Sequence, residues 1–194
     1  MRLKILQAGD PVLRRPARPL TITEIKGPDI QRLIRDMRET MHAAPGVGLA
    51  APQVGLSIQL AVLEDRPEAV RDLTPEQLAE RERCPVPFQV LINPTITFAS
   101  DDCAEFFEGC LSIAGFAAIV PRSRTVRVDF LDEKAEAGSL EAVGWHARIL
   151  QHEIDHLQGG LYIDRMRSRS FASVDNLIQH WKGLSTAEIL QRLS

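Results

Sequence analysis

Two histidines and a glutamate in the last third of the chain form a pattern that is typical of metal-dependent hydrolysis. Residues 152–156 read His-Glu-Ile-Asp-His, which is H-E-x-x-H. Residues four apart lie on one face of an α-helix, so the imidazoles of His152 and His156 can reach one divalent ion. Glu153 would then lie beside a water activated by that ion. The pattern predicts a metal site on a helix.

A catalytic site of this kind needs a third protein ligand, and the residues alone leave it open. One peptidase class continues the pattern to a third histidine, but that position is Tyr162. Downstream carboxylates lack a helical motif around them; they are Asp164, Asp175 and Glu188. Cys110, in the segment E-G-C-L-S, is a candidate thiolate ligand, although a free cysteine is more often a small buried hydrophobe. Cys84 and Cys103 are expected to be buried in that way.

A glycine-rich segment, G-V-G-L-A-A-P-Q at residues 46–53, is the third feature that could serve a ligand. It superficially matches a dinucleotide-binding fingerprint, which requires a preceding strand and a following helix. A helical pattern precedes it instead, and Pro52 obstructs helix growth. The segment therefore favours close approach of a ligand to the backbone, with the Gln53 amide as a hydrogen-bond donor.

Taken together, the three segments resemble the motifs of the peptide deformylase family, G-x-G-x-A-A-x-Q, E-G-C-x-S and Q-H-E-x-D-H. They are intact here and in family order, and the resemblance extends from about Ile5 to Asp164. It implies hydrolysis of the N-formyl group from the initiator methionine of a nascent peptide. Formyl-methionyl nascent chains are then the expected partners, and formate is a product.

The resemblance also implies roles for individual residues. Cys110, His152 and His156 would hold Fe²⁺, for which Zn²⁺, Ni²⁺ or Co²⁺ could substitute. Glu153 would transfer the proton, while the Gln53 amide and the Leu111 backbone N–H would donate to the formyl oxygen. The expected substrate-binding residues are Gly46, Val47, Gly48, Glu108, Gly109, Trp145 and Ile149. Phe106 is a further candidate for the methionine pocket, and Arg122 is an alternative partner for Glu108.

Two other hydrolase classes remain as alternatives. One is a metallopeptidase of the H-E-x-x-H type, and the other is a cysteine hydrolase with Cys110 as nucleophile and His152 as base. A binding protein with a decayed site would lack turnover, but Glu153 and Gln53 are both present.

The elements that must position these residues follow from periodicity. Helices are expected over 29–43, from Gly144 to a cap at Gly159-Gly160, and in short turns within 171–181 and 186–193. Strands are expected over 58–63, 89–92 and 124–131, an extended arm over 2–20, and a charged surface insertion over 64–83. These elements predict an α+β fold, with mixed, mainly antiparallel strands wrapped around a central metal-binding helix.

Length, composition and charge exclude several classes of protein. The chain has 194 residues, of which 44% are hydrophobic and 25% charged, and residues 1–194 are expected to form a single catalytic domain. A formal charge of −3 argues against direct DNA binding, and no segment predicts a membrane span. Three cysteines fit a reducing compartment, so a cytoplasmic protein is expected. The family's ribosome contact would need a basic C-terminal helix, but the only lysine and arginine residues after Phe171 are Lys182 and Arg192.

Overall fold

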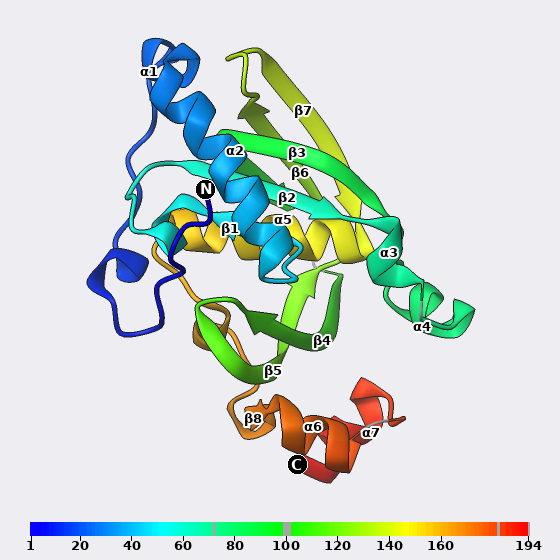
Figure 1. The fold of residues 1–194 in the computed structure, drawn as a ribbon. Helices are drawn as coiled ribbons and strands as arrows, with labels where there is room; N and C mark the ends of the chain where they lie inside the picture. Colours follow the sequence, from blue (N-terminus) through cyan, green and yellow to red (C-terminus); the bar gives the residue numbers. More distant parts are fainter. Residues whose placement is uncertain (72, 99–101, 182, 194) are drawn as a thin grey trace.

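The computed structural model describes residues 1–71, 73–98, 102–181 and 183–193, so Lys182 lies outside the described residues. Its strands form two antiparallel sheets (Figure 1). The five-stranded sheet has the order β1-β2-β3-β6-β7, formed by Gly48–Ala50, Leu60–Asp65, Val86–Phe98, Thr125–Leu131 and Ala137–Val143. The three-stranded sheet has the order β4-β5-β8, formed by Cys103–Cys110, Ile113–Ser123 and Ala172–Ser173.

Helices cover the sheets and join them. The α-helices are α1 Ile22–Lys26, α2 Pro28–Ala43, α3 Pro67–Val70, α4 Pro75–Glu80, α5 Gly144–Leu157, α6 Val174–Trp181 and α7 Thr186–Leu193. Single turns of 3₁₀-helix are η1 Pro11–Arg14, η2 Ala51–Val54, η3 Tyr162–Asp164 and η4 Ser168–Ser170. No helix in the described ranges combines the length and apolarity needed to cross a membrane.

The hydrophobic core has two layers because strand residues alternate between the faces of the larger sheet. On β3, Val90 and Ile92 pack with α2, whereas Leu91 packs with α5. α2 therefore covers one face of this sheet. α5 covers the other face and lies between the two sheets (Figure 1).

Helix α5 is enclosed on nearly all sides, and both of its ends are sharply defined. Gly144 starts it with φ +57°, and Gly159 follows it with φ +80°, a left-handed conformation that favours glycine. The Gln151 amide accepts from the Ser123 N–H at 3.1 Å and donates to the Ser123 carbonyl at 2.8 Å. These bonds fix α5 against β5 and determine how its side chains face the smaller sheet.

The main sequence-based expectations for the fold are confirmed, with differences at strand boundaries. The helices at 29–43 and from Gly144 are present as α2 and α5, and the expected turns near the C-terminus are α6 and α7. β2 begins at Leu60 rather than Ile58, because Ile58 forms an isolated bridge with Arg18 of the N-terminal arm. The prediction that Cys84 and Cys103 are buried is wrong, because both are exposed.

Strands β4, β5 and β7 were not predicted, and their composition explains why. β4 reads CAEFFEGC without a regular alternation, β5 contains glycine and proline, and β7 reads AGSLEAV. Glycine, alanine, proline and glutamate have low strand propensity. Pairing with neighbouring strands forms them: β4 and β5 make a hairpin that turns at Leu111 and Ser112.

We predict that Leu150→Ala destabilises the fold by about 2–5 kcal/mol, because it opens a cavity between α5 and the larger sheet. Leu150 is fully buried, whereas Ile178 is 53% exposed and its alanine variant is the control. Urea unfolding measures both free energies. Equal values for the two variants would contradict the described packing of α5.

Candidate metal centre and active-site pocket

The three expected metal ligands come together from two distant parts of the chain. His152 and His156 lie one turn apart on α5, and Cys110 ends β4 at the hairpin turn. One ligand atom from each residue lies within 4.8 Å of the other two. The Cys110 Sγ is 3.3 Å from the His156 Nε2.

This donor set fits a divalent transition metal. A tetrahedral ion with a bond of about 2.3 Å to sulfur and about 2.1 Å to nitrogen would separate those atoms by roughly 3.6 Å, close to the spacing found. Burial lowers the pKa of His156, and the neighbouring His152 lowers it further, which favours the neutral imidazole that binds metals. A thiolate with two imidazoles suits zinc, iron, cobalt or nickel.

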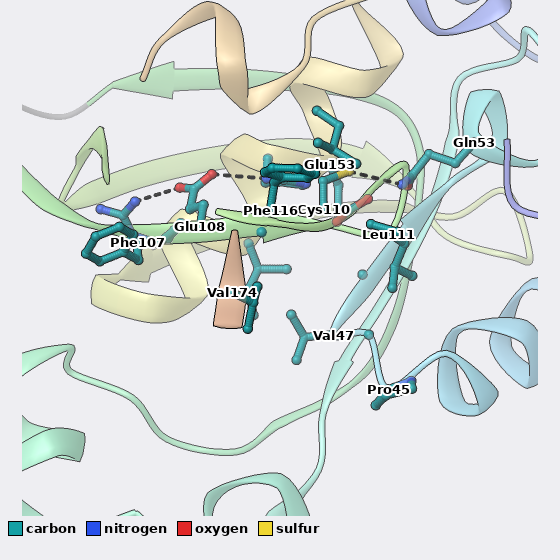
Figure 2. Close-up of a pocket in the computed structure, with 18 of the residues that line it drawn as sticks. Pro45, Val47, Gln53, Phe107, Glu108, Cys110, Leu111, Phe116, Glu153 and Val174 are labelled. Atoms are coloured by element: carbon teal, nitrogen blue, oxygen red, sulfur yellow. Dashed lines mark hydrogen bonds and ion pairs between the residues drawn. The ribbon is translucent and has the colours of Figure 1, made fainter. Parts of the chain in front are cut away.

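Glu108 orients one of the ligands. Its carboxylate is buried and receives a bidentate pair of hydrogen bonds from Arg122, at 2.9 and 3.0 Å, and another from Arg148 at 2.6 Å. Its Oε2 lies 3.1 Å from the His152 Nδ1 (Figure 2). An ionised carboxylate only accepts, so Nδ1 carries the proton and Nε2 faces the ligand cluster. The two hydrogen bonds from Arg122 confirm the alternative pairing of Glu108 with Arg122.

The electrostatics of Glu108 and His152 reinforce each other. Burial opposes charge on Glu108, but hydrogen bonds from His152 and Arg122 outweigh it and hold the pKa of Glu108 well below its usual range. Burial likewise opposes protonation of His152, while Cys110 and Glu108 raise its pKa. Glu108 lines the cavity, but its carboxylate is committed to these partners, so the geometry favours a positioning role over direct substrate contact.

Glu153 lies against the glycine-rich segment, and the contact requires a glycine. A Cβ on Gly48 would be 2.1 Å from the Glu153 Oε1, which no side chain can satisfy without moving the carboxylate. The buried Oε2 has no hydrogen-bond partner within the described ranges. Burial raises the pKa of Glu153 to about 7. A carboxyl group with this pKa can take up and release a proton at neutral pH.

The Gln53 amide is oriented toward the metal ligands. Its Oε1 accepts from the Ala50 N–H at 2.8 Å, and its Nε2 donates to the Ser112 Oγ at 3.2 Å. The same Nε2 lies 3.5 Å from the Cys110 Sγ (Figure 2). Because Gln53 is only 2% exposed, the donor is fixed in place before any ligand binds.

The N-terminal arm connects the two loops of the site, which the sequence did not indicate. The Leu6 N–H donates to the Gln53 carbonyl at 2.8 Å. The Gln7 side chain donates to the Leu111 carbonyl at 3.0 Å and accepts from the Ala114 N–H at 3.2 Å. Arg148 was also missed, although it lies four residues before His152 and therefore on the same helix face.

These residues line a cavity of about 440 Å³. Two expected site residues do not line it: His156, which is buried, and Phe106. The others all do: Gly46, Val47, Gly48, Gln53, Glu108, Gly109, Cys110, Leu111, Trp145, Ile149, His152 and Glu153. Phe107, Phe116 and Val174 were not expected there, and Val174 reaches the cavity from α6 (Figure 2). Phe106 packs instead against the guanidinium groups of Arg81 and Arg148.

Comparison with known proteins agrees with this geometry. Residues 2–172 match the family model described as polypeptide deformylase. Peptide deformylase 3 of Streptomyces avermitilis is 50% identical over 181 residues, which cover 92% of this chain and 78% of that protein. The chloroplastic peptide deformylase 1A of Solanum lycopersicum is 45% identical over 173 residues, which cover 89% of this chain but only 62% of that protein.

A solved structure has the same fold. The class I type b peptide deformylase from Acinetobacter baumannii with Met-Ala-Ser bound superposes with a TM-score of 0.76 at 31% sequence identity. The match covers 86% of this chain and 99% of that one. The chain therefore belongs to the peptide deformylase family, which is metal-dependent and removes the formyl group from the N-terminal methionine of nascent peptides.

Proposed function

We propose that this chain itself hydrolyses the N-formyl group of formyl-methionyl peptides, using the residues assigned above. The observation that carries the proposal is the convergence of three kinds of group on one cavity: a Cys-His-His donor set, the carboxylate of Glu153 and the amide of Gln53. Formate release from a formyl-methionyl peptide, with and without a chelator, tests it.

The arrangement of strands suggests how a peptide is held. β1 and β4 are edge strands of the two sheets, and residues from both line the cavity. Gly46, Gly48 and Gly109 line the cavity without side chains of their own, and an extended chain can add hydrogen bonds to a strand edge. The Acinetobacter baumannii relative has Met-Ala-Ser bound, which supports a peptide as the ligand of this chain. Trp145 and Ile149 are the proposed walls for the methionine side chain.

Proton transfer falls to Glu153. A divalent ion held by Cys110, His152 and His156 would lower the pKa of a coordinated water and polarise the formyl carbonyl. Glu153 accepts the proton that the attacking water loses and then delivers it to the leaving amine, so that the C–N bond breaks and formate is released. The raised pKa of Glu153 suits both directions of transfer.

The formyl oxygen gains negative charge as its carbon becomes tetrahedral. Gln53 Nε2 is already directed at the ligand cluster, and Leu111 contributes its backbone N–H from the hairpin turn. Anchoring of the amide through Ala50 and Ser112 means that little reorganisation is needed during the reaction.

Iron is the proposed ion in the cell, and the cytoplasm is the proposed compartment. The three cysteines are free thiols, which supports a reducing environment. We also propose that residues 1–194 act as one catalytic domain, because the N-terminal arm and α6 both contribute to the site. Ribosome docking stays a prediction, and α6 and α7 are the segments in which to test it.

A cysteine hydrolase with Cys110 as nucleophile and His152 as base is the competitor that the geometry permits, because the Cys110 thiol interacts with His152 and also lies within hydrogen-bond range of His156. Such an enzyme would remain active in chelator and be inactivated by thiol alkylation. Loss of activity in chelator, restored by added metal, separates the two mechanisms.

Replacing Glu153 with Gln should retain the metal and lower kcat by about 10²- to 10⁴-fold, because the amide cannot transfer the proton. Glu141→Gln, on the exposed part of β7, is the matched control. Metal content and steady-state formate release measure the effect. A near-normal rate for Glu153→Gln would disprove its proton-transfer role.

Gln53→Leu keeps similar volume but removes the donor, so kcat should fall by about 10²- to 10³-fold with metal content unchanged. Ser112→Ala removes only a partner of that amide and should have a far smaller effect. An increase confined to KM would instead make Gln53 a substrate-positioning residue.

We expect aerobic preparations to contain zinc or nickel, and anaerobically iron-loaded protein to be most active but to lose activity in air, because iron and Cys110 can be oxidised. Cys110→Ser should lose tight metal binding, whereas the exposed Cys84→Ser and Cys103→Ser variants should keep it. Metal analysis and activity under both atmospheres measure this. Full metal occupancy in Cys110→Ser, or an oxygen-stable iron enzyme, would contradict it.

A further inference from the structure

The charged insertion that carries α3 and α4 packs against the N-terminal end of α5 (Figure 1). Trp145, in the first turn of α5, lines the cavity. A Cβ on Gly144 would lie 2.4 Å from the Glu82 Cβ, so only a glycine permits this approach. Glu82 also forms an ion pair with Arg124 at 3.0 Å. The insertion is therefore held against the helix that bears the metal ligands.

Two arginines of the insertion contact two aromatic residues, Trp145 and Phe106. The Arg81 guanidinium carbon lies 5.7 Å from the ring centre of Trp145 and 5.3 Å from that of Phe106. Arg83 lies 4.6 Å from the centre of the Trp145 ring. Trp145 itself lines the cavity. The insertion thus touches the outer side of a pocket wall.

Among the residues that the structure describes, cation–π contacts are the polar contacts available to orient the Trp145 indole. Its Nε1 is buried and has no hydrogen-bond partner within the described ranges, so no hydrogen bond from that nitrogen determines the ring position. Burial lowers the pKa of Arg81, which shows that its guanidinium is partly removed from water. Cation–π attraction is stronger for a desolvated cation.

We propose that Arg81, together with the nearer Arg83, holds the Trp145 indole in the pocket wall and so sets the space for the substrate's first side chain, which makes Arg81 a specificity-determining residue. The proposal rests on the proposed function, because it assigns the specificity of that same cavity. Arg81 does not line the cavity and acts through Trp145.

Arg81 is a better experimental target than Arg83. Arg83 forms two hydrogen bonds with the fully buried Asp65, at 2.7 and 2.9 Å. Its removal would leave a buried carboxylate without this partner and would destabilise the fold. Arg81→Met keeps the aliphatic bulk and removes the charge. Arg81→Lys keeps a cation, and Arg71→Ala, at an exposed position of the same insertion, is the control.

The kinetic test compares peptides that begin with formyl-methionine and formyl-phenylalanine. For Arg81→Met we expect KM for the methionine peptide to rise about fivefold, with kcat within about twofold of the parent. Preference for methionine over phenylalanine in kcat/KM should also fall about fivefold, because a less restrained indole admits a larger side chain. Arg81→Lys should show smaller changes and Arg71→Ala none.

Fluorescence quenching measures the exposure of the Trp145 ring directly. The chain has two tryptophans, so a Trp181→Phe background leaves Trp145 as the only one. Acrylamide should quench the fluorescence of Trp145 more strongly in Arg81→Met than in the parent or in Arg71→Ala. A formyl-methionyl peptide should protect Trp145 from quenching in the parent and protect it less in Arg81→Met.

Two results would overturn the proposal. One is Arg81→Met with the same KM, preference and quenching as Arg71→Ala; the other is a loss of kcat with KM and preference unchanged. If Arg81→Met does not fold, Arg81→Ala replaces it in both tests. A folded Arg81→Ala variant with the same KM, preference and quenching as the parent would then overturn the proposal. If the proposed function is wrong, the parent releases no formate. Acrylamide quenching would still show whether Arg81 restrains the Trp145 ring, so the two failures are distinguishable.

Discussion

The buried carboxylate of Glu108 is the group on which the rest of the site depends. It comes from β4, yet its partners Arg148 and His152 come from α5, and Arg122 comes from β5. A buried carboxylate is costly unless its charge is paired and its oxygens accept hydrogen bonds. The β4–β5 hairpin and α5 meet this requirement in only one relative position. The same position brings Cys110 to the two histidines.

Close backbone approach is the second constraint, and glycine meets it where other residues would fail. Gly48 allows the Glu153 carboxylate to lie against β1, and Gly46 leaves room for the Leu111 side chain, which would be 2.8 Å from a Cβ at that position. Both contacts join the larger sheet to groups near the metal ligands. Glu153, the proposed base, and the hairpin turn are thereby held against the strand edge with which we propose that a peptide pairs.

Segments without catalytic residues of their own complete the cavity. The N-terminal arm joins the Gln53 and Leu111 loops through Leu6 and Gln7, and α6 adds Val174 to the wall. The insertion before β3 contacts Trp145 of the wall through Arg81 and Arg83. Substrate preference can therefore depend on residues that no motif contains.

The sequence by itself determined the chemistry of the site and the elements with strong local patterns. The spacing of His152, Glu153 and His156 predicts a helix that can hold a metal ion, because the helical period is a local property of the chain. The helix at 29–43 follows from periodicity in the same way. Three motifs in order were also sufficient to indicate the family, while Cys110 alone was an ambiguous ligand.

Only the tertiary structure decided how these parts meet. β4 and β7 have weak local signals and form because neighbouring strands pair with them. The contacts of Glu108 with His152 and of Gln7 with Leu111 join residues 44 and 104 positions apart in the chain. Local periodicity carries no information about such separations, because they depend on which surfaces pack together. The residue types of the candidate site were therefore visible in the sequence, whereas their orientation and the shape of the pocket were set by long-range packing.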